Sequence, residues 1–188
     1  MNNDEVSLVQ NKLIENSVAV DQYPDGLFHQ HMFEQYKICI EMADRVSQRR
    51  NLANTLFLTL NTGVLTALAV TLEKVNIGDA PSETGLTLIV SGFSIIALIS
   101  LILVCCAWQT IITSYRQLNR AKYLVIGAYE RMLPTSPYYH AEWCALGEGK
   151  DPDKYTQLNV VESFIPKCLI FAYTLIIAFL VLRHLIGN

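Results

Sequence analysis

The chain has 188 residues and a net charge of -3, and its composition is 52% hydrophobic but only 16% charged. This balance is more apolar than that of a typical soluble protein, and the near-neutral charge favours no particular partner. Five scattered cysteines with no C-x-x-C pair argue against a disulfide framework and indicate a reducing compartment for the soluble parts.

Residues 1–51 carry charged side chains throughout and form the first predicted region. Their second half, "HMFEQYKICIEMADRVSQRR", has apolar residues at a helical spacing, namely Phe33, Tyr36, Ile40, Ala43 and Val46. Only Gly63 weakens the helical pattern between Phe33 and Leu72. We therefore expect this helix to run directly into the apolar segment that follows.

Two long apolar segments come next. Residues 52–72 hold no charge and, as a helix of about 31 Å, match a hydrocarbon core. Residues 73–85 form a short Gly/Pro/Ser loop, predicted to lie outside the cell. Residues 86–113 are again uncharged and can span the membrane with tilt or continue beyond it.

The third region, residues 114–163, continues the second span as a helix until Pro134 and Pro137 interrupt it. Short helices are expected around residues 141–146 and 155–163. Residues 164–186 form a third apolar segment, in which Lys167 and Arg183 can reach opposite interfaces. A buried or interfacial helix is the alternative for this segment.

Lys and Arg are distributed unequally about these spans. Of the fourteen Lys and Arg residues, twelve lie either before the first span or between the second and third spans, including Lys167 at the edge of the third. Because cytoplasmic segments carry the excess of such residues, we expect these two regions inside and the C-terminus outside. The predicted fold is an all-α integral membrane protein with three transmembrane helices, two of which extend into the cytoplasm as an antiparallel pair.

Catalytic and metal-binding patterns are weak. His140, Glu142 and Cys144 form an H-x-E-x-C string, but the P-C-x-x-C half of a zinc deaminase site is missing. His29 and His31 have no partner cluster nearby in the sequence. No phosphate-binding or nucleophile-elbow motif is present, so we expect no enzyme activity, no metal and no cofactor.

Polar residues follow two lines along the first span. At 100° per residue, the threonines fall on one narrow stripe, and two asparagines make a second line beside it: Thr55, Thr59, Thr62 and Thr66, with Asn54 and Asn61. Such residues allow helices to pack and to form hydrogen bonds across their interface. They would equally suit the wall of a water-filled path in an oligomer, and we predict both lines as pore-lining.

Basic and aromatic residues alternate just outside the first two spans. The predicted nucleotide or phosphate site combines two groups: Arg45, Arg49 and Arg50, with Tyr115, Arg116, Arg120, Lys122 and Tyr123. Cations and aromatic rings suit phosphates and stacked bases. Alternatively, the same cations set the orientation of the spans in the membrane and contact anionic lipid headgroups.

Several stretches resemble a known family. "DRVSQRRNLANTLFLTLNTG" and "WQTIITSYRQLNRAKYLVIGAYERMLP", with "YYHAEWCAL" and "YTQLNVVESFIP", are similar to the SLATT-type small membrane effectors of bacterial antiphage systems. The similarity covers about residues 36–166, and the third span is an addition to the two-span plan. The resemblance implies pairing with a nucleotidyltransferase and, as in Hailong-type systems, a channel controlled by a nucleotide polymer.

These observations lead to one functional prediction and one rival. We predict a homo-oligomeric channel in the bacterial inner membrane that arrests growth as an antiphage effector and is controlled by a cytoplasmic nucleotide or oligonucleotide. Its expected partners are further copies of itself, the lipid bilayer, the nucleotide and the nucleotidyltransferase. The rival is a non-conducting membrane scaffold that binds lipid or a partner protein.

Overall fold

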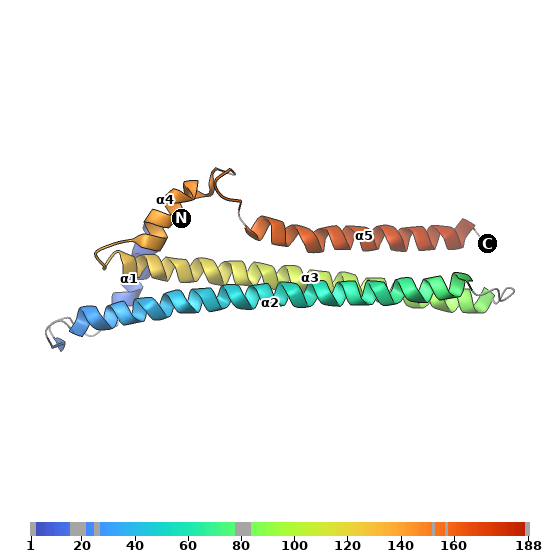
Figure 1. Ribbon diagram of the computed structural model, residues 1–188, viewed down its shortest axis with the longest axis horizontal. Coiled ribbons are helices and arrows are strands. Elements are labelled where there is room, and N and C mark those ends of the chain that lie inside the picture. The colour runs from blue at the N-terminus through green and yellow to red at the C-terminus, as the bar shows by residue number, and fades with distance from the viewer. Residues whose placement is uncertain are drawn as a thin grey trace. The chain divides into compact units, whose positions relative to one another are not determined.

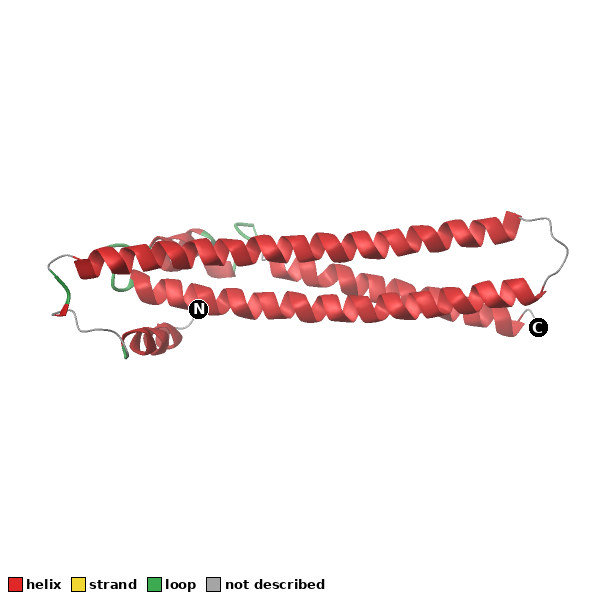
Figure 2. Ribbon diagram, turned by 90° about the horizontal axis from the view of Figure 1, so that it is seen from below, coloured by secondary structure: helices red, strands yellow, loops and turns green. Residues whose placement is uncertain are grey.

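The computed structural model describes residues 3–15, 22–24, 27–77, 84–151, 153–156 and 158–186. Within these residues all regular structure is helical, as Figure 2 shows. The elements, in chain order, are α1 (Asn3–Ile14), α2 (Leu27–Ile77), α3 (Thr84–Glu130), a π-helix (Pro137–Glu142), α4 (Trp143–Ala145), a 3₁₀-helix (Gly147–Gly149) and α5 (Leu158–Ile186).

Helix α2 is one uninterrupted helix of 51 residues, as the absence of strong breakers predicts. Its length of about 77 Å is more than twice the thickness of a hydrocarbon core, so part of it must lie outside the membrane. The charged residues of α2 fall before residue 51 and at Glu73 and Lys74, and the uncharged residues 52–72 between them are the part that suits lipid. The helix continues to Ile77, past the predicted end of the span, and residues 78–83 of the predicted loop lie outside the described residues.

Helix α3 is likewise continuous over 47 residues and ends at Glu130. It stops ahead of Pro134, as predicted, because the residue before a proline disfavours the helical conformation and proline has no N–H to continue the ladder. The π-helix and α4 then occupy residues 137–145, close to the predicted short helix at 141–146.

Helix α5 corrects one expectation about the third span. It begins at Leu158 and runs unbroken to Ile186, so the short helix expected at 155–163 and the third span at 164–186 form one helix, with Pro166 inside it. Proline there cannot donate the usual hydrogen bond to the carbonyl four residues earlier, which weakens the helix locally. The Pro166 side chain is fully buried in the packing of the unit that contains α5.

Three of these helices are long and apolar enough to cross a membrane, by length and composition: Leu27–Thr71, Val90–Glu130 and Val161–Leu182. The prediction of an all-α chain with three helices of spanning length is therefore confirmed. Which ends face the cytoplasm stays a prediction from the charge distribution.

Contacts divide the chain into two compact units, each described by itself. The charged unit consists of Met1–Arg50 and Thr113–Leu158, and the apolar unit consists of Asn51–Ile112 and Asn159–Asn188. The core of the charged unit brings together Met32, Tyr36, Ala43, Ile126 and Tyr129. The core of the apolar unit brings together Leu68, Leu98, Leu101, Cys105 and Tyr173.

Helices α2 and α3 lie side by side and antiparallel in each unit, in agreement with the sequence (Figure 1). In the charged unit, the pairs that form hydrogen bonds are Tyr36 with Glu130, Gln35 with Tyr129, and Ser47 with Asn119. In the apolar unit, Asn54 pairs with Trp108 and Asn61 with Cys105. Within each unit, a later residue of α2 pairs with an earlier residue of α3, as expected for two antiparallel helices joined as a hairpin.

Candidate functional site

The side chain of Asn61 joins all three helices of the apolar unit. Its amide nitrogen donates to the carbonyl oxygen of Phe57 at 2.7 Å. Its Oδ1 accepts a hydrogen bond from the Tyr173 hydroxyl on α5 at 2.9 Å and from the Cys105 thiol on α3 at 3.3 Å. At 1% exposed, this amide would be costly without partners, and these bonds fix which face of α2 points into the unit.

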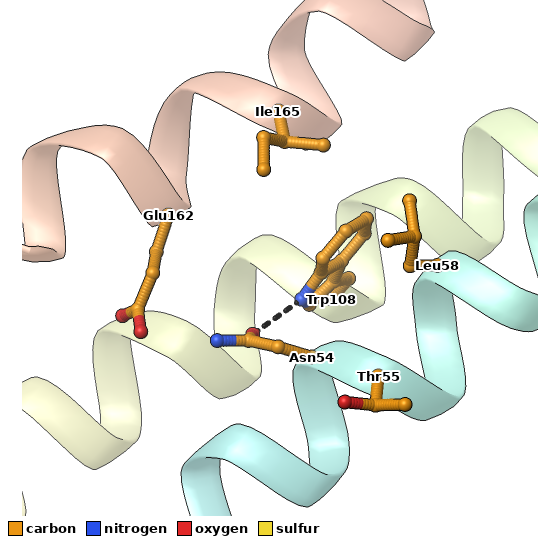
Figure 3. A pocket seen from close by; sticks show the side chains of 6 residues that line it. All are labelled: Asn54, Thr55, Leu58, Trp108, Glu162 and Ile165. Atoms are coloured by element: carbon orange, nitrogen blue, oxygen red, sulfur yellow. Dashed lines mark hydrogen bonds between the residues drawn. The ribbon is translucent and has the colours of Figure 1, made fainter.

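Asn54, seven residues earlier, repeats this arrangement near one end of the unit. Its Oδ1 accepts a hydrogen bond from Nε1 of Trp108 at 2.9 Å, drawn as the dashed line in Figure 3. The indole ring stacks on Phe57 with a centroid separation of 5.7 Å. One residue further along α3, Gln109 donates to the carbonyl oxygen of Ser163 on α5 at 2.6 Å. Polar side chains therefore connect the three helices at two levels.

A small cavity of about 140 Å³ lies beside Asn54. Side chains from α2, α3 and α5 surround it (Figure 3): Asn54, Thr55, Leu58, Trp108, Glu162 and Ile165. Glu162 is the charged residue of the lining and is only 8% exposed. The sequence interpretation did not single out Glu162, although an isolated acid in "NVVESFIP", close to an apolar span, was a signal for a buried polar site.

The four threonines of the first span face away from the Asn61 network. All of them are exposed in the single chain: Thr55, Thr59, Thr62 and Thr66. At 100° per residue they lie roughly 100–160° around α2 from Asn61. Three of the hydroxyls donate to the carbonyl oxygen four residues earlier, at 3.0 Å from Thr55, 2.9 Å from Thr62 and 2.8 Å from Thr66.

The two predicted pore-lining lines thus have different surroundings. Asn54 and Asn61 bind other helices of the same chain, whereas the threonine line is exposed, with Thr55 also bordering the small cavity beside Asn54. A role in a pore stays a prediction for all six residues. The structure makes the threonine line the better candidate, because its side chains are accessible to water or to a neighbouring subunit.

Glu130 is a buried acid of the charged unit with several hydrogen-bond partners. It is 2% exposed, and its carboxylate accepts four hydrogen bonds. Oε1 accepts from the Tyr36 hydroxyl and the Tyr138 N–H, both at 2.9 Å. Oε2 accepts from the Ser136 hydroxyl at 2.6 Å and the Tyr139 N–H at 2.9 Å. These bonds supply partners for a buried charge and for N–H groups at the start of a helix, which have none within that helix.

The packing around Glu130 brings the π-helix close to α3. A side chain at Gly127 would meet the ring of Tyr139, since a Cβ atom there would lie 2.5 Å from it. Tyr36 is 6% exposed, and burial, followed by its hydrogen bond to Glu130, raises the pKa of its phenol. Tyr36 is therefore a stable neutral donor to the carboxylate. Glu130 was missed at the sequence level, although an acid that ends the apolar run "YLVIGAYE" is unusual.

The predicted nucleotide residues fall near one level of α2 and α3, around the contact between Ser47 and Asn119. Five are exposed, namely Arg45, Arg49, Arg116, Arg120 and Tyr123, and three are half-buried, namely Arg50, Tyr115 and Lys122.

Two of the exposed arginines already bind carboxylates. Arg45 pairs with Glu41 at 2.6 Å, and Arg120 pairs with Glu5 of α1 at 2.8 Å. Both pairs are exposed, so each contributes little to stability and can be exchanged for another anion. Tyr123 is 39% exposed, and the partial burial of its ring, followed by the carboxylate of Glu142, raises the pKa of its phenol.

The H-x-E-x-C string of the sequence lies on two short helices. His140 and Glu142 lie on the π-helix and Cys144 on α4. Among the residues that the structure describes, no three His, Cys, Asp or Glu side chains are placed so that they could hold a metal ion.

A comparison with protein-family models places these features in a known family. The model of the octameric membrane protein family (8xMP) matches residues 33–182, which include most of both units. The chain belongs to this family. The match confirms the prediction of a homo-oligomeric, multi-pass membrane protein. No curated protein and no solved structure matches the chain.

The Asn61 network yields a test by paired substitution. Asn61→Leu should destabilise the apolar unit by about 1–2 kcal/mol, because it leaves the Tyr173 hydroxyl buried without its acceptor. Adding Tyr173→Phe should recover part of this stability, since it removes that hydroxyl as well. Unfolding of the full chain in mixed micelles by increasing SDS measures both changes. A double variant no more stable than Asn61→Leu would contradict the hydrogen bond.

Glu130 yields a second test. Glu130→Gln keeps the shape of the side chain but replaces one acceptor oxygen with a donor, so it should cost about 2–4 kcal/mol. Amide hydrogen exchange should become faster at Tyr138 and Tyr139. Glu34→Gln is the matched control on α2, because Glu34 forms only an exposed pair with Lys37 and its substitution should cost less than about 1 kcal/mol. Unchanged exchange in Glu130→Gln would disprove the role of the carboxylate.

Proposed function

We propose that this protein is a homo-oligomeric membrane channel whose water-filled path is lined by the threonine line of α2. The observation that carries the proposal is the position of Thr55, Thr59, Thr62 and Thr66 on the exposed side of an uncharged span, in a member of an octameric family. One chain with three spans cannot enclose a path, but several copies can place the same helix face around a common axis.

The threonine hydroxyls suit such a wall. Each hydroxyl that donates to its own helix backbone keeps lone pairs that can accept from water. The uncharged middle of the span gives no site for a proton relay or an ion-coupled carrier, and passive conduction is the function that fits it best.

Control of the channel is assigned to the charged unit. We propose that a nucleotide or oligonucleotide binds the exposed cations Arg49, Arg116 and Arg120 near the contact between Ser47 and Asn119. The resemblance to the SLATT-type effectors supports this ligand and the pairing with a nucleotidyltransferase. It also supports a location in the bacterial inner membrane and a role in antiphage growth arrest. In this proposal, the ligand acts by preferring one of two channel states, and no catalytic step is involved.

A non-conducting scaffold is the second candidate, and one observation favours it. Hydroxyls that are satisfied by backbone carbonyls four residues earlier can also lie in a dry helix–helix contact. A scaffold of this kind would use the cations of the charged unit to bind lipid or a partner protein.

Ion flux separates the channel from the scaffold. The purified protein in liposomes should release a trapped ion gradient, and Thr59→Leu with Thr62→Leu should reduce the flux by roughly tenfold or more, because apolar constrictions exclude water. The control is Ser100→Leu with Thr110→Leu, two exposed hydroxyls on α3 with the same backbone bond. An absence of ion flux with the wild-type protein would contradict the channel proposal. Equal ion flux through the two double variants would show that residues 52–72 do not line the pore.

Nucleotide control has its own test. Alanine at Arg49, Arg116 and Arg120 should weaken the binding of labelled single-stranded homopolymers of each base by roughly tenfold or more for each arginine that binds a phosphate. Insertion into the membrane should be unaffected. The matched control is alanine at Lys12, Lys37 and Lys154, which are exposed cations elsewhere in the charged unit. Equal binding by the two triple variants would exclude the proposed site.

A further inference from the structure

A groove on the surface of the charged unit runs between α2 and α3. It has a volume of about 210 Å³ and is lined from both helices. We call it the α2–α3 groove and define it by its residues: Ile38, Cys39, Met42, Ala121, Lys122 and Val125. Apart from the Lys122 amine, its lining is apolar.

Large apolar side chains are exposed along this groove. Ile38 is 56% exposed and Met42 is 43% exposed, one turn apart on α2. Leu118, one turn before Lys122 on α3, is 45% exposed. Contiguous apolar surface of this kind marks an interaction site when it lies in water.

Lipid does not explain this exposure. The same stretch of α2 carries Glu34, Lys37, Glu41 and Arg45, all of them exposed. Ionisable side chains at this density cannot lie in hydrocarbon, and residues 52–72 already supply a full span. The apolar surface of the α2–α3 groove therefore faces water in an isolated chain.

The geometry points to a second copy of this chain as the occupant of the α2–α3 groove. The match to an octameric family provides the partner, since each subunit of a ring must present a face to its neighbour. In a ring with head-to-tail contacts, the groove of one subunit receives a different face of the next. Assembly would then bury Ile38, Met42 and Leu118, and it would extend the subunit contact from the membrane into the charged unit.

The rim of the groove adds a requirement for its occupant. At 100° per residue, Arg45 and Arg49 lie on the same face of α2 as Ile38 and Met42. Arg45 pairs with Glu41, so the excess positive charge at the rim comes from Arg49 and from Lys122 within the groove. The opposing face of the second copy should therefore be apolar and flanked by acidic or neutral groups, because a cationic face would be repelled.

Crosslinking from within the groove tests this directly. The photoreactive residue benzoylphenylalanine, placed at Met42 in the full-length chain in native membranes, should give an adduct of two copies on illumination. The control position is Gln30, an exposed residue about 120° around α2 from Met42. Self-adducts from Met42 and not from Gln30 support the proposal. Adducts of Met42 with lipid or with another protein, equal self-adducts from both positions, or no self-adduct from Met42 would overturn it.

A charge substitution supplies a second measurement. Met42→Glu places a carboxylate in the buried contact and should raise the dissociation constant of the oligomer by roughly tenfold or more. Gln30→Glu adds the same charge outside the groove and should leave assembly unchanged. Helix content should stay the same in both variants, because each side chain is exposed in the single chain. An unchanged oligomer distribution for Met42→Glu would count against the groove as a subunit contact, whether or not the protein conducts ions.

Discussion

The hydrogen bonds of Asn61 determine how the apolar unit presents itself to its surroundings. Because the Oδ1 of this amide must accept hydrogen bonds from Cys105 on α3 and Tyr173 on α5, α2 must turn the Asn61 face towards these two helices. That rotation leaves the threonine line on the outer side. The inward position of Asn61 and the outward position of the threonine line thus both follow from the hydrogen bonds of Asn61.

The charged unit is organised by a comparable device. Glu130 accepts hydrogen bonds from Tyr36 on α2, 94 residues away in sequence, and from the nearby start of the π-helix, so one carboxylate joins α2, the end of α3 and the π-helix. The exposed cations stand clear of this network, and their ion pairs with Glu5 and Glu41 are the kind that an incoming phosphate can replace. The buried hydrogen bonds of Glu130 and the exchangeable surface ion pairs are therefore separate, which is compatible with the proposed binding of a nucleotide at the surface.

The sequence predicted the helices well, because uncharged runs and helical spacing are local properties. The two polar lines of α2 were also visible, but their roles were not, since the partners of Asn61 are 44 and 112 residues away along the chain. Glu130 and Glu162 escaped notice for the same reason: burial of an acid depends on segments that only the fold brings together. Residues 155–163 and 164–186 were predicted as separate segments, but α5 runs from Leu158 through Pro166 without a break.

In the proposed channel, copies of this chain assemble with the threonine line facing water. A nitroxide spin label at Thr62, in the protein reconstituted into bilayers, measures this most directly. A water-soluble relaxing agent should reach the label more readily than oxygen does, and labels on neighbouring subunits should broaden each other's spectra. A label that is relaxed by oxygen as strongly as one at the exposed, apolar Leu103, without broadening, would show that this face meets lipid and would contradict such an assembly.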